Sequence, residues 1–268
     1  MTAMERGHHS FPGPVVRAIA AGTVLFLVAP IAAIAIVSFS ASRFLEFPPR
    51  EYSLRWYANA LTDESWRAAL LLSFKTAVIV AVLATMIGGL AAYGFVRGRF
   101  RGKAALLGIA LSPLVVPGIV TAVGMYFVFA RFGLIETQAG LVLAHTALAL
   151  PVALISVASS VSTLERPLEH AARSLGATPF ETFRYVTLPL IRPGVAVAAL
   201  FAFVTSFDEP VVALFIAGTH AETLPKRMWD GIQYEIDPTA TAMSTMLVLF
   251  AAAVVFVVTW LRREPEGR

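Results

Sequence analysis

Cysteine is absent from the 268 residues of this chain. Its absence excludes a disulfide, a thiolate nucleophile and a cysteine-ligated metal cluster. Charge is also scarce, because Asp, Glu, Lys and Arg make up only 14% of the residues, whereas hydrophobic residues make up 57%. The mean hydropathy of +0.75 lies outside the range of soluble globular domains. The composition therefore indicates a membrane protein.

Motifs for catalysis and nucleotide binding are also missing from the sequence. The closest approach to a phosphate-binding loop, residues 98–104, has the wrong glycine spacing and no hydroxyl for Mg²⁺. The five histidines are scattered, without a His-Glu-x-x-His or a Gly-x-Ser-x-Gly motif. We therefore predict no catalytic site and no metal site, and we expect His145, within an apolar run, to hydrogen-bond to a neighbouring helix. The formal net charge is +4, but the charged residues lie between apolar runs rather than on one soluble surface. Nucleic acid is therefore not an expected partner.

Long apolar runs are what the sequence has in abundance. A helix needs roughly 20 apolar residues to cross a bilayer. Six such runs occupy residues 15–37, 68–96, 104–129, 139–161, 193–217 and 239–261. Pro113 and Pro117 lie within the third run and predict a kinked or locally unwound helix there. The expected fold class is an all-α membrane protein with six transmembrane helices.

The distribution of basic residues predicts the orientation of these helices. Six crossings place both termini on one side, together with thirteen of the 21 Lys and Arg residues. The positive-inside rule then puts both termini in the cytoplasm, an N-in/C-in topology. The first run is too long for a secretory signal and is expected to be a retained helix. Residues 38–67, which carry Tyr52, Trp56 and Tyr57, are expected to form an external loop with aromatic anchors at the membrane interface.

The charged segment 162–192 lies between the fourth and fifth runs, on the predicted cytoplasmic side. Small and apolar residues recur in it at helical spacing and would form one face: Leu168, Ala171, Ala172 and Leu175. Charged residues of the same helix would stay in solvent: Arg166, Glu169 and Arg173. Gly176 is predicted to end the helix in a left-handed conformation. Pro179 is predicted to start a second short helix, over about 180–186. Periodicity alone leaves two readings open, an ordinary amphipathic loop and a docking surface.

Spacing within this segment favours the docking reading. The segment resembles the cytoplasmic EAA loop of binding-protein-dependent ATP-binding-cassette importers. That pattern is Glu-Ala-Ala, three residues, Gly, nine residues, a hydrophobic residue, any residue, Leu and Pro. The residues in register are Glu169, Ala171, Ala172, Gly176, Val186, Leu188 and Pro189. His170 departs from the pattern by interrupting the triplet. In that family the loop forms a coupling helix that rests in a groove of the ATPase subunit.

The resemblance implies an assembly as well as a fold. It implies a type I importer permease fold in the bacterial inner membrane, with a five-helix core over residues 68–262 and its coupling loop at 162–192. Residues 1–67 would add a tail, a first helix and an external loop, and residues 263–268 a cytoplasmic tail. The implied partners are an ATPase dimer that binds ATP and Mg²⁺, a second, different permease subunit, a periplasmic solute-binding protein and membrane lipid. No cofactor is expected in this chain.

Two acids near the outer end of the fifth run are candidates for the translocation path. Charges within a membrane span are costly and therefore point to function. Asp208 and Glu209 would attract an organic cation, and Phe207 would add a cation–π face. The alternative is an outer helix end with solvated acids or a salt bridge to the partner subunit.

The region around these acids carries a narrower resemblance. The segments 206–211, 223–229 and 235–238, with Ser244 and Thr245, are similar in order and spacing to the second permease subunit of spermidine/putrescine importers. This similarity implies a small, cationic, nitrogen-containing solute such as a polyamine. Permeases for opines, aminophosphonates and other solutes are similar and remain alternatives. An ion-coupled secondary transporter is the alternative from another class, but it would need internal repeats and paired charges within the membrane.

Overall fold

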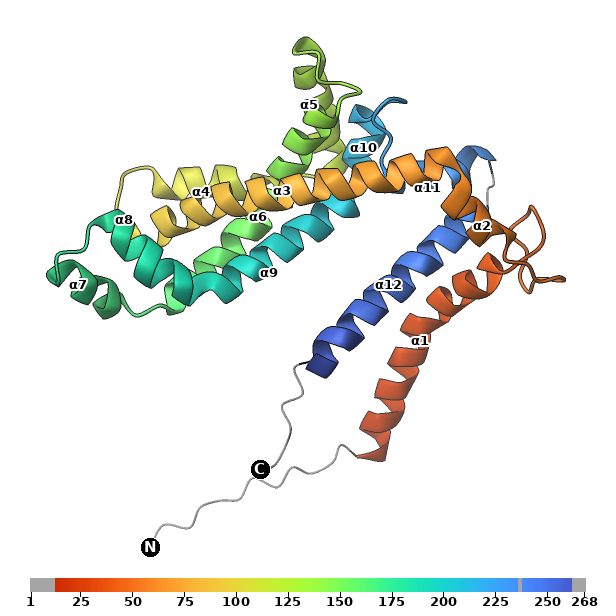
Figure 1. The fold of residues 1–268 in the computed structure, drawn as a ribbon, viewed down its shortest axis with the longest axis horizontal. Coiled ribbons are helices and arrows are strands. Elements are labelled where there is room, and N and C mark those ends of the chain that lie inside the picture. The colour runs from red at the N-terminus through yellow and green to blue at the C-terminus, as the bar shows by residue number, and fades with distance from the viewer. Residues whose placement is uncertain (1–12, 236–237, 262–268) are drawn as a thin grey trace, which may run out of the picture. The chain divides into compact units, whose positions relative to one another are not determined.

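The computed structural model describes residues 13–235 and 238–261, in which every element is a helix apart from an isolated bridge between Ser40 and Tyr52 (Figure 1). The predicted cytoplasmic tail 263–268 and the first twelve residues lie outside the described part. The chain divides into two compact units, one formed by Met1–Thr62 with Gly231–Arg268 and the other by Asp63–Asp230. The all-helical prediction is confirmed.

In the described part of the chain, the first unit holds three α-helices and a π-helical turn over Gly231–Glu235. The α-helices are α1 (Pro14–Ser38), α2 (Arg55–Thr62) and α12 (Thr239–Leu261), with α12 packed against both of the others. The amide Nδ2 of Asn59 in α2 donates to Oγ1 of Thr239 at 3.0 Å. This hydrogen bond joins the two ends of the sequence within one unit.

The segment between α1 and α2 is held by side chains of α2. Nε1 of Trp56 donates to the carbonyl of Ser40 at 2.8 Å, and the hydroxyls of Tyr57 and Ser38 lie 2.6 Å apart. The predicted loop 38–67 therefore contains a helix, α2, which was not predicted. Two of the three aromatics expected to be membrane anchors fasten this loop to itself.

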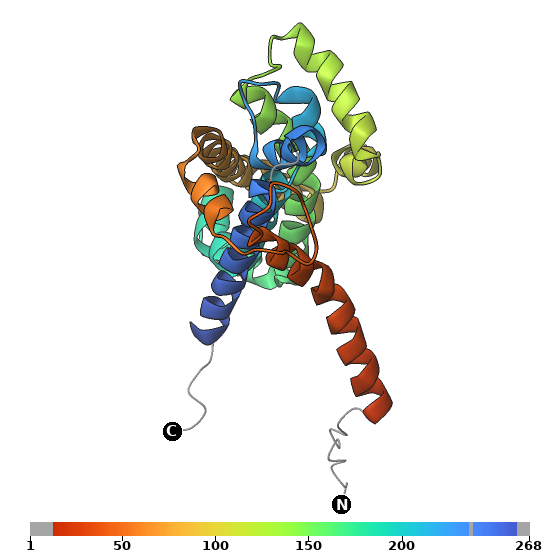
Figure 2. The same ribbon diagram turned by 90° about the vertical axis from the view of Figure 1, so that its right-hand side faces the viewer.

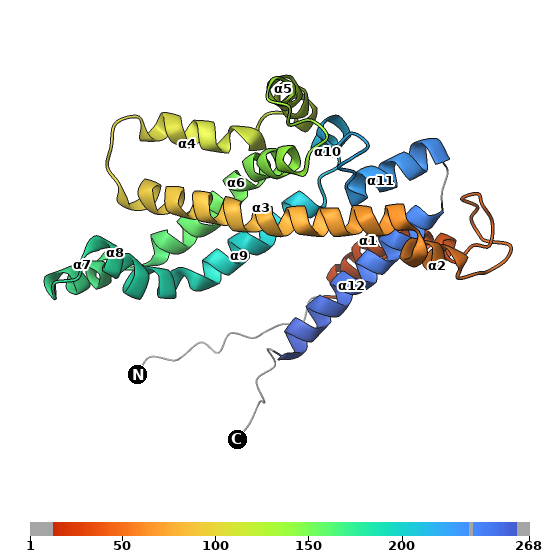
Figure 3. The same cartoon turned by 45° about the horizontal axis from the view of Figure 1, so that its top comes forward.

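The second unit is centred on a bundle of three long helices. They are α3 (Glu64–Arg97), α6 (Gln138–Thr163) and α9 (Leu188–Phe207), and each packs against the other two (Figure 3). Small residues line the contacts and are fully buried: Ala84, Ala92, Ala149, Ala153, Ala198 and Ala202. Small side chains let helix backbones approach closely, which is how helices associate when lipid removes most of the hydrophobic drive.

The third apolar run is a broken helix. It consists of α4 (Lys103–Leu111), a 3₁₀ turn over Ser112–Leu114, and α5 (Gly118–Arg131), with a bend of 105° between its two parts. Figure 2 shows α4 nearly end-on while α5 is seen along its length. Proline removes a backbone donor and clashes with the preceding turn, so Pro113 and Pro117 account for the break. The predicted kink is confirmed.

Three of the helices long and apolar enough to cross a membrane, α1, α3 and α6, follow the predicted runs closely. Four such helices are described, and the bent pair α4–α5 gives a fifth span if it counts as one. The sixth predicted run coincides with α12.

The predicted fifth run, residues 193–217, was wrong at both ends. The helix begins at Pro179 and ends at Phe207, and α10 (Val211–Ile216) follows as a separate helix. Pro210 precedes α10, and it lacks the N–H that would continue α9. The candidate acids therefore lie in a break between helices rather than inside one.

Candidate coupling site

The predicted helix before Gly176 is α7 (Arg166–Ser174). Gly176 has φ 94°, the left-handed conformation that was predicted. The amides of Gly176 and Ala177 donate to the carbonyls of Arg173 and Ala172 at 3.0 and 3.1 Å, which closes the end of the helix as in a Schellman motif. The glycine thus ends α7 and turns the chain toward the next helix.

The second helix, α8 (Pro179–Thr182), begins at the predicted proline. It carries a capping box, in which the amide of Thr178 donates to Oε2 of Glu181 at 2.7 Å and the amide of Glu181 donates to Oγ1 of Thr178 at 3.2 Å. A π-helical turn over Phe183–Thr187 joins α8 to α9 without a break. The second short helix is therefore the first part of a spanning helix.

Large apolar side chains on α7, α8 and the turns beside them face outward. The exposed fractions are 45% for Leu168, 90% for Leu175, 68% for Phe180 and 70% for Tyr185. Ala171 is exposed among them and Ala172 is half-buried. We call Leu168, Leu175, Phe180 and Tyr185 the apolar cap. Large apolar side chains this exposed on one helix pair favour a site that another surface covers.

Glu169 differs from its neighbours because it points inward. Its side chain is 9% exposed, its Oε2 lies 2.8 Å from Nε of Arg97, and its Oε1 accepts a hydrogen bond from Oγ1 of Thr187 at 2.7 Å. The prediction that Glu169 stays solvated was wrong. A carboxylate is buried only when it is paired, and its partners lie 72 and 18 positions away in the sequence, beyond the reach of a periodicity argument.

Arg97 makes structural contacts in addition to contributing to the charge distribution that predicts the membrane orientation. It is the last residue of α3, and its Nη2 donates to the carbonyl of Leu164, the residue that caps α6, at 3.0 Å. Nearby, the rings of Tyr93 and Phe183 meet edge to face with centroids 5.3 Å apart. In the sequence Arg97 is only one of the basic residues that predict the orientation of the helices. Its role here, and those of Thr187 and Tyr93, could not be predicted, because only the tertiary fold brings these residues together.

Leu188 and Pro189, the last residues of the EAA pattern, form the first turn of α9. Both are half-buried rather than part of the apolar cap. The pattern therefore covers a surface helix, its glycine turn and the root of a spanning helix.

The candidate path residues lie at the opposite end of α9. Asp208 follows the last residue of α9 and is exposed. Oε1 of Glu209 accepts from the amide of Val212 at 3.0 Å and so caps α10. Phe207 stacks on Phe203, with centroids 5.6 Å apart and an interplanar angle of 13°. Asp208 is therefore the exposed acid of the two, and it directly follows the stacked Phe207 in the sequence.

A third ring extends this stack. Phe74 of α3 meets Phe203 at 5.7 Å with an interplanar angle of 71°, and its side chain is 53% exposed. Phe203 and Phe207 are four residues apart on one helix, a spacing that is visible in the sequence. The contact with Phe74 could not be read from spacing, since it joins different helices.

His145 makes the predicted helix-to-helix hydrogen bond. Its Nδ1 lies 3.0 Å from Oγ of Ser206, which links α6 to α9 immediately before Phe207. In residues 13–235 and 238–261, no group of three or more His, Cys, Asp or Glu side chains is placed to hold a metal ion.

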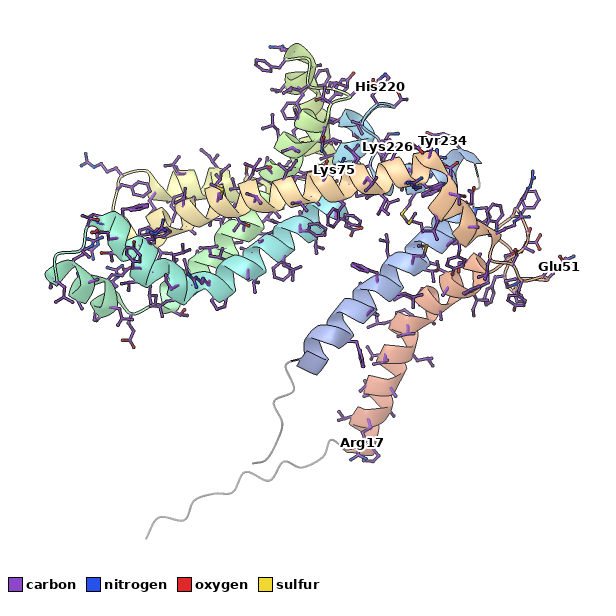
Figure 4. All side chains as sticks on the ribbon, viewed as in Figure 1. Arg17, Glu51, Lys75, His220, Lys226 and Tyr234 are labelled. Carbon is purple, nitrogen blue, oxygen red and sulfur yellow. The ribbon has the colours of Figure 1, made fainter. Side chains whose placement is uncertain are left out.

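The same end of the second unit carries ion pairs on α11 (Leu224–Asp230), which packs against α3. Nζ of Lys226 lies 2.6 Å from Oδ2 of Asp230 and 3.6 Å from Oε1 of Glu222, and its position on α11 is labelled in Figure 4. These pairs are a few residues apart on or next to one short helix. They stabilise α11 locally.

Long apolar helices with a turn-joined helix pair at one end define a polytopic α-helical membrane protein. Residues 84–263 match the family of binding-protein-dependent transport system inner membrane components, and the chain belongs to that family. It is thus a multi-pass inner-membrane protein and a permease subunit of an ATP-binding-cassette importer.

Three curated relatives align with most of the chain. The putrescine transport system permease protein PotI of Escherichia coli K12 is 32% identical over 242 residues, which cover 88% of this chain and 85% of PotI. The spermidine/putrescine transport system permease protein PotC of the same strain is 29% identical, with 89% and 90% covered. The trehalose transport system permease protein SugB of Mycobacterium tuberculosis is 30% identical, with 79% and 78% covered.

Solved structures share the fold. A chain of a bacterial ABC transporter that imports the acidic polysaccharide alginate matches with a TM-score of 0.70 and 16% identity, covering 95% of this chain and 99% of that one. A chain from the alginate transporter in complex with its alginate-bound periplasmic protein matches with a TM-score of 0.68 and 14% identity, covering 93% and 94%. At these identities the likeness concerns the fold alone.

Proposed function

We propose that this chain passes a small, cationic, nitrogen-containing solute of the polyamine type from a periplasmic binding protein to the cytoplasm. The observation that carries the proposal is its similarity to two permeases named for putrescine and spermidine, over 88% and 89% of the chain. Similarity to a trehalose permease at 30% identity means that identity alone does not choose between a cation and a sugar. The choice therefore depends on the side chains at the outer end of α9.

Those side chains suit a cation. Asp208 is exposed and directly follows Phe207 in the sequence, the ring of Phe207 stacks on Phe203, and Phe203 meets Phe74. An organic ammonium is attracted to a carboxylate and to the face of an aromatic ring, and the ring interaction is worth roughly 0.5–2 kcal/mol. One oxygen of Glu209 caps α10, so we assign the larger share of the attraction to Asp208.

Uptake into proteoliposomes tests the solute class. The complete importer is reconstituted, and uptake of labelled putrescine, spermidine and trehalose is compared. We expect saturable uptake of a polyamine, which Asp208→Asn lowers by raising KM, while Glu64→Gln, a change at an exposed acid on α3, serves as the matched control. Uptake of trehalose with no polyamine uptake would refute the proposed solute and leave the permease family unaffected.

We also propose six spans with both termini in the cytoplasm. Support comes from the basic residues at the α7 end of the second unit: Arg97, Arg99, Arg101, Lys103, Arg166, Arg173, Arg184 and Arg192. The positive-inside rule makes that end cytoplasmic. Because the chain has no cysteine, single cysteines at Leu175 and Glu136 can be labelled from either side. An impermeant maleimide should reach position 136 from outside the cell and position 175 only from inside.

The apolar cap is the surface we assign to the ATPase dimer, with Glu169, Ala171, Ala172, Gly176, Leu188 and Pro189 as the coupling loop. Ala171 lies exposed between the larger side chains and allows close approach of the partner. ATP and Mg²⁺ are bound and hydrolysed by the separate ATPase chain. A second permease subunit completes the translocation path. Closure of the ATPase dimer moves α7 and thereby reorients the membrane helices around this path.

Cross-linking tests this assignment. A cysteine at Leu175 should cross-link to the ATPase subunit in membranes, and Leu175→Glu should abolish ATPase stimulation by the loaded binding protein. Leu54→Glu, a change at an exposed leucine outside α7 and α8, is the matched control. Full stimulation in Leu175→Glu together with an absence of cross-links would remove the coupling role from the apolar cap.

A further inference from the structure

A buried polar cluster lies at the end of the second unit that we propose is cytoplasmic. It consists of Arg97, Glu169 and Thr187. Arg97 ends α3, Glu169 lies on α7, and Thr187 precedes the first residue of α9. Figure 3 shows the end of α3 beside α7 and α8. The cluster therefore joins the surface helix to the ends of α3 and α9, and through Arg97 to the end of α6.

The geometry leaves little of Glu169 for a partner protein. Its two oxygens are engaged at 2.8 Å by Arg97 and at 2.7 Å by Thr187, and its side chain is 9% exposed. Arg97 in turn donates through Nη2 to Leu164, the cap of α6, so one guanidinium contacts both the end of α6 and the carboxylate of α7. Breaking a buried pair by removing one partner strands the other charge. The cluster thus favours a single position of α7 on the bundle.

We infer that Arg97, Glu169 and Thr187 are positioning residues that hold α7 rigidly on α3, α6 and α9, so that movement imposed on α7 reaches the membrane helices without slippage. The inference rests on the proposed coupling function. It assigns Glu169 to the inside of the permease rather than to the contact with the ATPase.

Distance measurements by pulsed electron spin resonance test the rigidity directly. Nitroxides are attached at Arg166 on α7 and at Leu90 on α3, which are both exposed, in the assembled importer with cysteine-free partner chains. In the wild-type background the distance distribution should be narrow and unchanged between the nucleotide-free and ATP–vanadate states. In Glu169→Gln and Arg97→Gln it should broaden. A wild-type distance that shifts with nucleotide, or variants as narrow as wild type, would overturn the inference.

Coupling provides a second readout. In Glu169→Gln, stimulation of the ATPase by loaded binding protein should fall by about fivefold or more. The exposed neighbours Glu165 and Arg99 supply matched controls. We expect wild-type stimulation in both Glu165→Gln and Arg99→Gln. The charge-reversed double variant, Arg97→Glu with Glu169→Arg, should recover part of the stimulation that is lost in Arg97→Glu alone or in Glu169→Arg alone.

The outcomes also separate this inference from the proposed function. Normal stimulation in Glu169→Gln alongside lost stimulation in Leu175→Glu would refute the positioning role and keep the docking role. If Glu169→Gln prevents the ATPase from assembling and charge reversal restores nothing, Glu169 contacts the ATPase itself and the positioning role is refuted. Failure of the docking role appears separately, as normal stimulation in Leu175→Glu.

Discussion

Nδ1 of His145 and Oγ of Ser206 lie 3.0 Å apart, with both side chains buried between α6 and α9. Ser206→Ala removes this bond at nearly constant volume and leaves the imidazole without that partner. Hydrogen bonds between membrane helices average about 0.6 kcal/mol, with values up to about 2. We expect a loss of stability in that range, seen as a lower midpoint of thermal unfolding in detergent. Ser156→Ala is the control, since its hydroxyl bonds within its own helix. Equal midpoints for the two variants would contradict the assigned role.

Two adjacent glycines of α3 offer a packing test. A Cβ at Gly88 would lie 3.0 Å from the amide nitrogen of Leu154 and 3.1 Å from Cβ of Ala153, whereas at Gly89 the nearest atom would be 3.8 Å away. Gly88→Ala should therefore force α3 and α6 apart, at a cost of about 1–3 kcal/mol. Gly89→Ala should be neutral or slightly stabilising because alanine favours helix. The test is the midpoint of thermal unfolding of each variant. A lower midpoint for Gly89→Ala than for Gly88→Ala would show that α3 and α6 do not meet at Gly88.

The start of α3 gives a pH-dependent prediction. The Ser65 hydroxyl and then the Trp66 amide hold the pKa of Asp63 below its ordinary value of 3.8, because they bond to the ionised carboxylate. The cap therefore stabilises the fold above the ordinary pKa and loses this effect as the pH falls through the lowered pKa. Asp63→Ala should cost about 1 kcal/mol at neutral pH.

The measurement is the midpoint of thermal unfolding as a function of pH. The gap between wild type and Asp63→Ala should stay constant from neutral pH to about pH 5 and should close below about pH 4. Asp63→Asn, a neutral cap, should reduce the loss at neutral pH. A gap that widens on acidification would contradict the assignment.

Gly176 tests the turn inside the coupling loop. Its φ of 94° is open in space but strained for any residue with a Cβ, and the strain is about 1–2 kcal/mol, smallest for asparagine. Gly176→Val should displace the end of α7 and lower the stimulated ATPase activity, whereas Gly176→Asn should retain most of it. Normal stimulation and transport in Gly176→Val would show that this turn has no part in coupling.

Local patterns predicted local features. The apolar length of α6 and α12, the left-handed Gly176 and the break near Pro113 and Pro117 each follow from a few neighbouring residues. The ends of α9 did not follow, because Pro193 is tolerated inside the helix while Pro210 precedes a break. A proline's effect depends on whether neighbouring helices satisfy the freed carbonyl, which the sequence does not display.

The features of the site that could not be predicted from the sequence depend on contacts between residues that are distant in the chain. The EAA spacing located Glu169, but helical periodicity placed it in solvent. Its burial depends on Arg97 and Thr187, which reach it only after α3, α7 and α9 have packed together. The ring contact between Phe74 and Phe203 has the same origin. Motif spacing therefore found the segment, and tertiary contacts decide which of its side chains face a partner.

ATP-driven uptake in proteoliposomes tests the central claim most directly. This chain is reconstituted with its second permease subunit, its ATPase and its solute-loaded binding protein, and uptake of labelled putrescine is measured with and without ATP. The account predicts uptake that needs ATP and every partner and that falls in Leu175→Glu. Uptake by this chain without the ATPase, driven by an ion gradient alone, would contradict it and indicate an ion-coupled transporter.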